Sequence, residues 1–229
     1  LIWEDWYYEG DAIRNNPVAV AVDSQGDPVV AYRREVRTTR PYINYIRAVK
    51  FIGASTGRIP STRWQILLPA NTDPAGMVID SQDNVVIAGS ARSPLDPPYS
   101  DLYLIKLDRM GSKLWNVYYN GGTQYVDRAV AIAKNVNDGI VVTGSSSHYE
   151  TGGNISRTIT QAYNASGQRL WSGQYGPFTD RGNNGPKALV VKSQTAYVCG
   201  TVGPISSTPN NDMFLHKIGT LSKISTLTP

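Results

Sequence analysis

Cysteine and charge are both scarce in this sequence. Its one cysteine, Cys199, cannot form a disulfide within the chain. Charged residues make up 17% of the 229 residues, and the net charge of +4 comes from scattered Lys and Arg residues. Because no run of like charges occurs, nucleic acid is not an expected partner.

Long apolar runs and metal or phosphate motifs are also missing. No stretch reaches the ~18 apolar residues of a transmembrane helix, so no membrane span is expected. The two histidines, His148 and His216, do not stand at a zinc-ligand spacing, and no phosphate loop or nucleophile elbow occurs. The sequence therefore predicts no metal site, no cofactor and no known catalytic motif.

The chain does contain an internal repeat. Similar apolar segments with a small-residue step recur as DPVVAYRR (27–34), NVVIAGSA (84–91), GIVVTGSS (139–146) and TAYVCGTV (195–202). The step falls at Gly89, Gly144 and Gly200, which are 55 and 56 residues apart, and Tyr32 takes its place in the first segment. A period of this length indicates one supersecondary unit repeated four times.

Each unit reads as four strands and lacks helical periodicity. The first two runs are apolar on both faces, as in buried strands, and turns such as DSQGD and DSQDN join them. The third run partly alternates, as expected for a half-covered strand. The sequence predicts one all-β domain over residues 1–229, a β-propeller of four-stranded antiparallel blades at approximately 11–70, 71–122, 123–176 and 177–229.

Two stretches carry a family resemblance. The residues GMVIDSQDNVVIAGS (76–90) and DLYLIKLDRMGSKLW (101–115) resemble the SBBP β-propeller repeat of bacteria and archaea. The turn before each tryptophan is also similar to pyrroloquinoline-quinone-type propeller repeats. The resemblance implies the propeller fold and little about function, because such families have many roles.

The chain opens in the middle of a repeat. Residues 1–10 match a fourth strand, so we expect them to form the outer strand of the last blade and to close the ring. Two alternatives remain open: further blades could precede residue 1, or two chains could build an eight-bladed ring.

Four tryptophans, Trp3, Trp64, Trp115 and Trp171, recur at one phase of the repeat. Such side chains can serve as stacking platforms for sugars or bases. Their periodic placement favours the other interpretation, packing between neighbouring blades.

A second recurring set consists of acidic and basic residues before each first strand. This set is Asp11, Arg14, Asp73, Asp127, Arg128, Asp180 and Arg181. At the mouth of a propeller channel, carboxylates could hold a cation or a polyol, and arginines could take an acidic group. Alternatively, each Asp could accept hydrogen bonds from its own turn or from a neighbouring blade.

Longer loops are expected on one face of the propeller, where binding residues tend to lie. Candidates in these loops are Tyr99, His148, Tyr149, Phe178 and Arg181. Of two glycosylation tripeptides, the one at Asn154 lies in a long loop and is the better acceptor, whereas turn chemistry explains Asn164.

These features favour a non-enzymatic propeller outside the cell or on its surface. It would bind a protein or glycan partner through the long-loop face, or assemble into an oligomer or filament. The alternative is a polysaccharide-active lyase or hydrolase whose site is the Asp/Arg-lined channel mouth.

Overall fold

The computed structural model describes residues 10, 12–38, 40–52, 61–69, 71–94, 96–150, 153–179, 185–202 and 212–219. These residues form fifteen strands in four antiparallel sheets. No helix in the described parts of the chain is long and apolar enough to cross a membrane. The expected all-β fold of antiparallel sheets is confirmed.

The sheets follow the chain, and each strand pairs with its neighbour in sequence. Sheet I contains β1 (Ile13–Val22), β2 (Pro28–Val36), β3 (Ile43–Ile52) and β4 (Ser61–Leu67). Sheet II contains β5 (Thr72–Ile79), β6 (Val85–Arg92), β7 (Ser100–Leu107) and β8 (Lys113–Tyr119). Sheet III contains β9 (Val126–Lys134), β10 (Ile140–Glu150), β11 (Gly153–Tyr163) and β12 (Arg169–Thr179). Sheet IV contains β13 (Gly185–Lys192), β14 (Thr195–Val202) and β15 (Asp212–Ile218).

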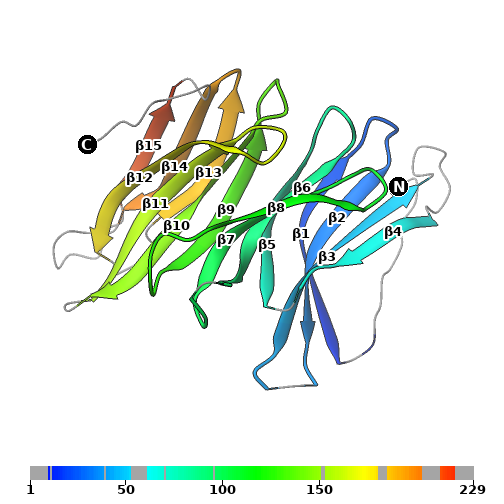
Figure 1. The fold of residues 1–229 in the computed structure, drawn as a ribbon, viewed down its shortest axis with the longest axis horizontal. Coiled ribbons are helices and arrows are strands. Elements are labelled where there is room, and N and C mark those ends of the chain that lie inside the picture. The colour runs from blue at the N-terminus through cyan, green and yellow to red at the C-terminus, as the bar shows by residue number, and fades with distance from the viewer. Residues whose placement is uncertain are drawn as a thin grey trace.

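The four sheets stand in a row in chain order, with sheets I and IV at opposite ends (Figure 1). The first strands make contact from one sheet to the next, β1 with β5, β5 with β9 and β9 with β13. The expected closure of a ring by residues 1–10, including Trp3, lies outside the described residues, apart from Gly10.

The hairpin turns form as their polar residues predict. Asp80 Oδ1 accepts hydrogen bonds from the backbone N–H groups of Gln82 and Asn84, both at 2.9 Å. Asp23 and Asn135 do the same in the corresponding turns of sheets I and III. These side chains satisfy turn donors that would otherwise need water, which is why Asp and Asn recur there.

The repeated glycine is required by a close backbone approach. The first strand has a β-bulge between Pro74 and Gly76 in sheet II and between Ala129 and Ala131 in sheet III. The bulge brings a backbone carbonyl oxygen of the first strand against the second strand. A Cβ atom on Gly144 would lie 2.0 Å from the Arg128 oxygen, and one on Gly89 would lie 2.2 Å from the Asp73 oxygen. The small-residue step therefore marks the bulge in sheets II, III and IV, whereas in sheet I the bulge after Pro17 lies opposite Tyr32.

Apolar side chains fill the space between successive sheets. One cluster joins sheets I and II around Ile46 and Ile87, and a second joins sheets II and III around Leu104 and Ile159. A third cluster joins sheets III and IV around Val198. Each sheet in the middle of the row is thus buried on both faces, and hydrophobic burial is the main force that holds the row together.

The tryptophans belong to these inter-sheet contacts. Trp64 packs on Gly111 of sheet II and donates from Nε1 to the Arg109 carbonyl at 3.0 Å. Trp115 makes the same contacts with Gly167 and with the Ala165 carbonyl, at 3.1 Å, and Trp171 packs against the third cluster. Packing between sheets is the correct interpretation for these three residues.

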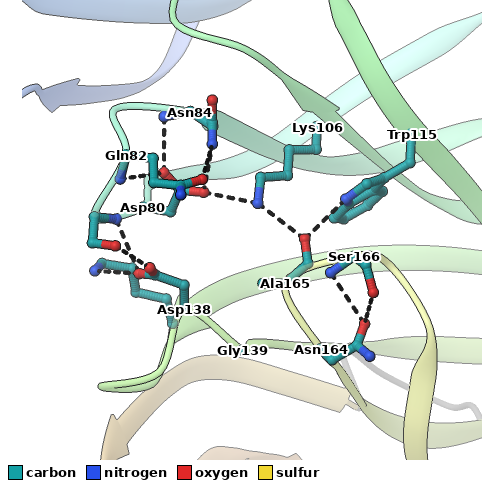
Figure 2. Close-up of polar contacts among 12 residues, drawn as sticks. Asp80, Gln82, Asn84, Lys106, Trp115, Asp138, Gly139, Asn164, Ala165 and Ser166 are labelled. Atoms are coloured by element: carbon teal, nitrogen blue, oxygen red, sulfur yellow. Dashed lines mark hydrogen bonds and ion pairs between the residues drawn. The ribbon is translucent and has the colours of Figure 1, made fainter.

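Buried ion pairs connect the turns to the sheets (Figure 2). Lys106 Nζ lies 2.8 Å from Asp80 Oδ2, with both side chains almost fully buried, and also donates to the Ala165 carbonyl of sheet III at 3.0 Å. Lys50 and Asp23 form the equivalent pair in sheet I at 2.5 Å. Burial alone would raise the pKa of Asp80, but hydrogen bonds from Lys106 and from Asn84 outweigh it and hold the pKa below its usual value.

The turns of neighbouring sheets also bind each other directly. Ser24 donates from its backbone nitrogen, at 2.8 Å, and from its hydroxyl, at 2.7 Å, to the Asp83 carboxylate of the next sheet. Ser81 makes the same two contacts with Asp138. Asp83 and Asp138 hold equivalent turn positions and have the same left-handed backbone conformation, with φ angles of 62° and 57°. Their carboxylates therefore point toward the serine of the preceding sheet in the same way.

We expect Lys106→Met to lower the free energy of unfolding by about 3–5 kcal/mol, because it leaves the Asp80 charge buried without a partner. Lys134→Met, which removes a partly exposed pair with Asp138, is the matched control and should cost at most about 1 kcal/mol. Sheet III has Asn135 and Ala162 where sheet II has the pair, so adding Asp80→Asn should recover part of the loss. Urea unfolding measures all three variants; equal losses for the two lysine variants would contradict the role given to Lys106.

Gly144→Ala should lower the free energy of unfolding by ~1–3 kcal/mol or more, because the new methyl group collides with the Arg128 carbonyl rather than with a movable side chain. Gly219→Ala is the control, because a Cβ there meets no atom within 4 Å. Thermal unfolding tests the pair, and a wild-type melting temperature for Gly144→Ala would rule out the steric account of the repeat.

Candidate functional site

The strand register shows which residues of the four first strands hold equivalent positions. Ala129 pairs with Gly144 as Pro74 pairs with Gly89, so the next residue toward the chain start is Arg128 in sheet III and Asp73 in sheet II. By the same pairing, Asn16 and Gly185 hold this position in sheets I and IV. One repeat position therefore carries four different residues.

The predicted ring of aspartates is not what the described residues form. Asp127 is equivalent to Thr72, one residue away from the position of Asp73. Because side chains alternate between the faces of a strand, a shift of one residue sends the two carboxylates in different directions. Of the other members, Arg14 is exposed and lines neither cavity described below, and Asp11, Asp180 and Arg181 lie outside the described residues.

A cavity of about 690 Å³ opens where the first strands begin. It is lined by residues from sheets I, II and III and by the loop that precedes β7. Its polar and aromatic lining consists of Asn16, Arg33, Asn71, Asp73, Ser90, Ser100, Tyr99 and Arg128. The volume is within the usual range of small-molecule sites.

Asp73 is the acidic group of this cavity. Its Oδ1 atom lies 3.7 Å from Arg33 Nη1, and its side chain is 48% exposed. Partial burial raises the pKa of Asp73, although the nearby charges of Arg33 and Arg128 oppose the rise. A carboxyl group with a raised pKa, placed between two cations, can exchange a proton closer to neutral pH than an ordinary aspartate.

The cavity also holds polar atoms with unused hydrogen-bonding capacity. Arg33 Nε and Asp73 Oδ1 are each shielded from solvent and have no hydrogen-bond partner among the described residues. Such orphan donors and acceptors are uncommon in folded proteins and often mark the place of a ligand or a bound water.

Asp127 has a structural environment instead. It is fully buried, and its Oδ2 atom accepts a hydrogen bond from the Gly121 N–H at 2.6 Å. Burial raises the pKa of Asp127 to about 6; the nearby Ser146 hydroxyl and the hydrogen bond from the Gly121 N–H oppose this rise, and the charge of Asp101 adds to it. Asp127 lines neither cavity, so it fixes the connection between β8 and β9.

A second cavity of about 270 Å³ adjoins the first and shares Tyr99, Val126 and Arg128 with it. Here the structure brings together Tyr99, from the loop before β7, with His148 and Tyr149, which were expected in a loop but lie in strand β10 paired with β11. The His148 ring stacks on Tyr125, with centroids 4.1 Å apart, while Tyr149 is 80% exposed. Phe178 is not described beyond its backbone, and glycosylation of Asn154, whose backbone lies in β11, stays a prediction.

Arg33 was missed by the sequence analysis, although a signal was present. The residues at its position in the other second strands are Ser90, Ser145 and Thr201, all small and polar. Arg33 breaks this pattern, and breaks in a repeat are where ligand sites are expected. No group of three or more His, Cys, Asp or Glu residues suited to a metal exists among the described residues.

The similarities of this chain to known proteins lie among solved structures. No protein-family model and no curated protein matches the chain. Among solved structures, the chain is similar to native Bacillus subtilis arabinanase Arb43A, with a TM-score of 0.41 and 13% identity over 86% of this chain and 71% of that one. The similar structure is that of an enzyme, in contrast to the expectation of a non-enzymatic protein.

We predict that Asp127→Asn removes a pH dependence of stability. The folded-state pKa of about 6 lies above the ordinary value near ~3.9, so wild-type stability falls as pH rises through this window, by up to about 3 kcal/mol. The neutral amide can still accept from Gly121, so the variant should be at least as stable as wild type at neutral pH. Urea unfolding at several pH values measures this effect. Asp108→Asn is the control, because Asn164 holds the equivalent turn in sheet III. If Asp127→Asn kept the wild-type dependence of stability on pH, the role given to the buried Asp127 carboxyl group would be wrong.

Proposed function

We propose that this chain is a polysaccharide-active enzyme, a lyase or hydrolase, whose site is the larger cavity around Asp73. The observation that carries the proposal is a carboxyl group of raised pKa between Arg33 and Arg128 in an open cavity. This combination offers a proton-transfer group and a means of binding an acidic or hydroxyl-rich substrate at the same place.

The neighbouring cavity supports an extended substrate. Arg128, Tyr99 and Val126 line both cavities, so the two lie next to each other and can hold neighbouring units of one sugar chain. The exposed ring of Tyr149 provides an apolar surface beside the second cavity, and aromatic rings commonly pack on the apolar faces of sugars.

The charge of the cavities favours an acidic sugar and elimination over hydrolysis. Hydrolysis of a glycosidic bond ordinarily uses two carboxyl groups, and Asp73 is the one carboxylate among the described residues that line the cavities. In an elimination, Asp73 would take the proton next to the substrate carboxylate while the arginines neutralise that carboxylate. The C–H electrons would form a carbon–carbon double bond as the glycosidic oxygen leaves and takes up a proton.

The proposal includes the finer points of the fold and the setting. The order of the sheets along the chain, with first strands in contact, suits a β-propeller whose first strands surround the channel. A polysaccharide substrate suits a place outside the cell or on its surface.

Asp73→Asn should lower turnover by roughly 10²–10⁴-fold without loss of folding, because the amide cannot exchange the proton. Purified chain is incubated with polygalacturonate and alginate, and with neutral arabinan and xylan for comparison. Ultraviolet absorbance of unsaturated products reports elimination, and new reducing ends without that absorbance report hydrolysis. Asp127→Asn is the matched control, since Asp127 is buried away from the cavities and should keep wild-type turnover. Full activity of Asp73→Asn, or no cleavage of any of these polymers, would refute the proposal.

A further inference from the structure

The two ends of the row of sheets expose apolar faces. On sheet I, Val20 and Val22 of β1 are 67% and 59% exposed. On sheet IV, Val190 of β13 is 59% exposed, and Met213 and Leu215 of β15 are 79% and 66% exposed. Apolar residues gathered in this way on the outside of a folded chain mark a surface that another protein surface covers.

The sheet I end face is equivalent to the face with which sheets II, III and IV each pack on the sheet before them. In register, Val20 corresponds to Met77, Ile132 and Leu189 in the following sheets. Each of these three residues packs against the preceding sheet. Sheet I thus presents to solvent the face on which sheets II, III and IV each accept a neighbour.

The sheet IV end face is the opposite half. Leu215 corresponds to Leu104 and Ala48, and Met213 corresponds to Leu102 and Ile46. Those four residues are fully buried against the following sheet. Lys217 extends the parallel, because it is exposed at the position where Lys106 is buried.

We infer that the sheet IV end face of one copy packs on the sheet I end face of a second copy. The contact would continue the internal arrangement. Within the chain, the face of each sheet that points toward the next sheet packs on the face of that next sheet that points back. Because the two faces differ, the contact is of the head-to-tail type, and two such contacts related by a two-fold axis close a ring. Two copies give eight sheets, within the ~4–8 blades usual for propellers.

The test uses the full chain and its mass in solution, measured by light scattering and sedimentation over a wide range of concentration. The wild type should have twice the mass of one chain. Val20→Lys and Leu215→Glu should each raise the dimer dissociation constant by about tenfold or more, and both changes fall on exposed side chains that the single copy does not need for folding. Val136→Lys is the control, since this valine is 75% exposed in the β9–β10 turn, away from both faces, and should leave the dimer intact.

A mixture of the two charge variants separates this arrangement from others. One contact of the mixed dimer is unchanged, and the other sets the introduced lysine of one copy opposite the introduced glutamate of the second, so the mixture should regain the dimer mass. A monomer at all concentrations, as a ring closed within one chain would give, overturns the inference. A mass above that of two copies, or a dimer that both variants leave intact, overturns it as well. Circular dichroism confirms that each variant is folded.

Discussion

The bulge in the first strand of each sheet is the constraint on which the rest of the structure depends. In sheets II, III and IV it presses a backbone carbonyl against the second strand, and only glycine tolerates that approach at Gly89, Gly144 and Gly200; in sheet I, Tyr32 holds this position. The bulge also adds one residue to the strand, which reverses the faces on either side of it. On one side of the bulge the strand packs in the core, and on the other it delivers Asp73 and Arg128 to the cavity. Core packing and site geometry are thus set by the same local feature.

Between sheets, specificity comes from polar contacts at fixed places in an apolar interface. The Ala165 carbonyl receives both Lys106 Nζ and Trp115 Nε1, so one backbone oxygen positions a charged and an aromatic side chain of the neighbouring sheet (Figure 2). The serine-to-aspartate contacts at the turns fix the height at which each sheet stands against the next. Hydrophobic burial has no direction of its own, and these bonds provide the registration that burial cannot.

Much of the fold could be predicted from the sequence, because the repeat exposes what is periodic. The hairpin turns, the glycine step and the packing of Trp64 and Trp115 all follow from residues that recur at one phase. The site could be predicted only in part, for the opposite reason. Counting residues placed Asp73 and Asp127 in one ring, whereas pairing around the bulge separates them by one residue and one face. Arg33 escaped notice because attention went to what the repeats share rather than to where one unit differs. Tyr99 lies in a loop as expected, whereas His148 and Tyr149 lie in β10, within a hairpin whose end the sequence analysis took for a loop; all three still line one cavity.

The linear order of the sheets has a consequence for how stability is distributed along the chain. Among the described residues, sheet II has neighbours on both sides and contains the most completely buried strands, β6 and β7, whereas sheet IV packs against another sheet on one side alone. In an array coupled through nearest neighbours, protection from local opening declines from the interior units toward the termini. A residue's tolerance to substitution therefore depends on the position of its sheet in the row as well as on its own surroundings. Sequence drift should accumulate at the ends of the array and be resisted at its centre.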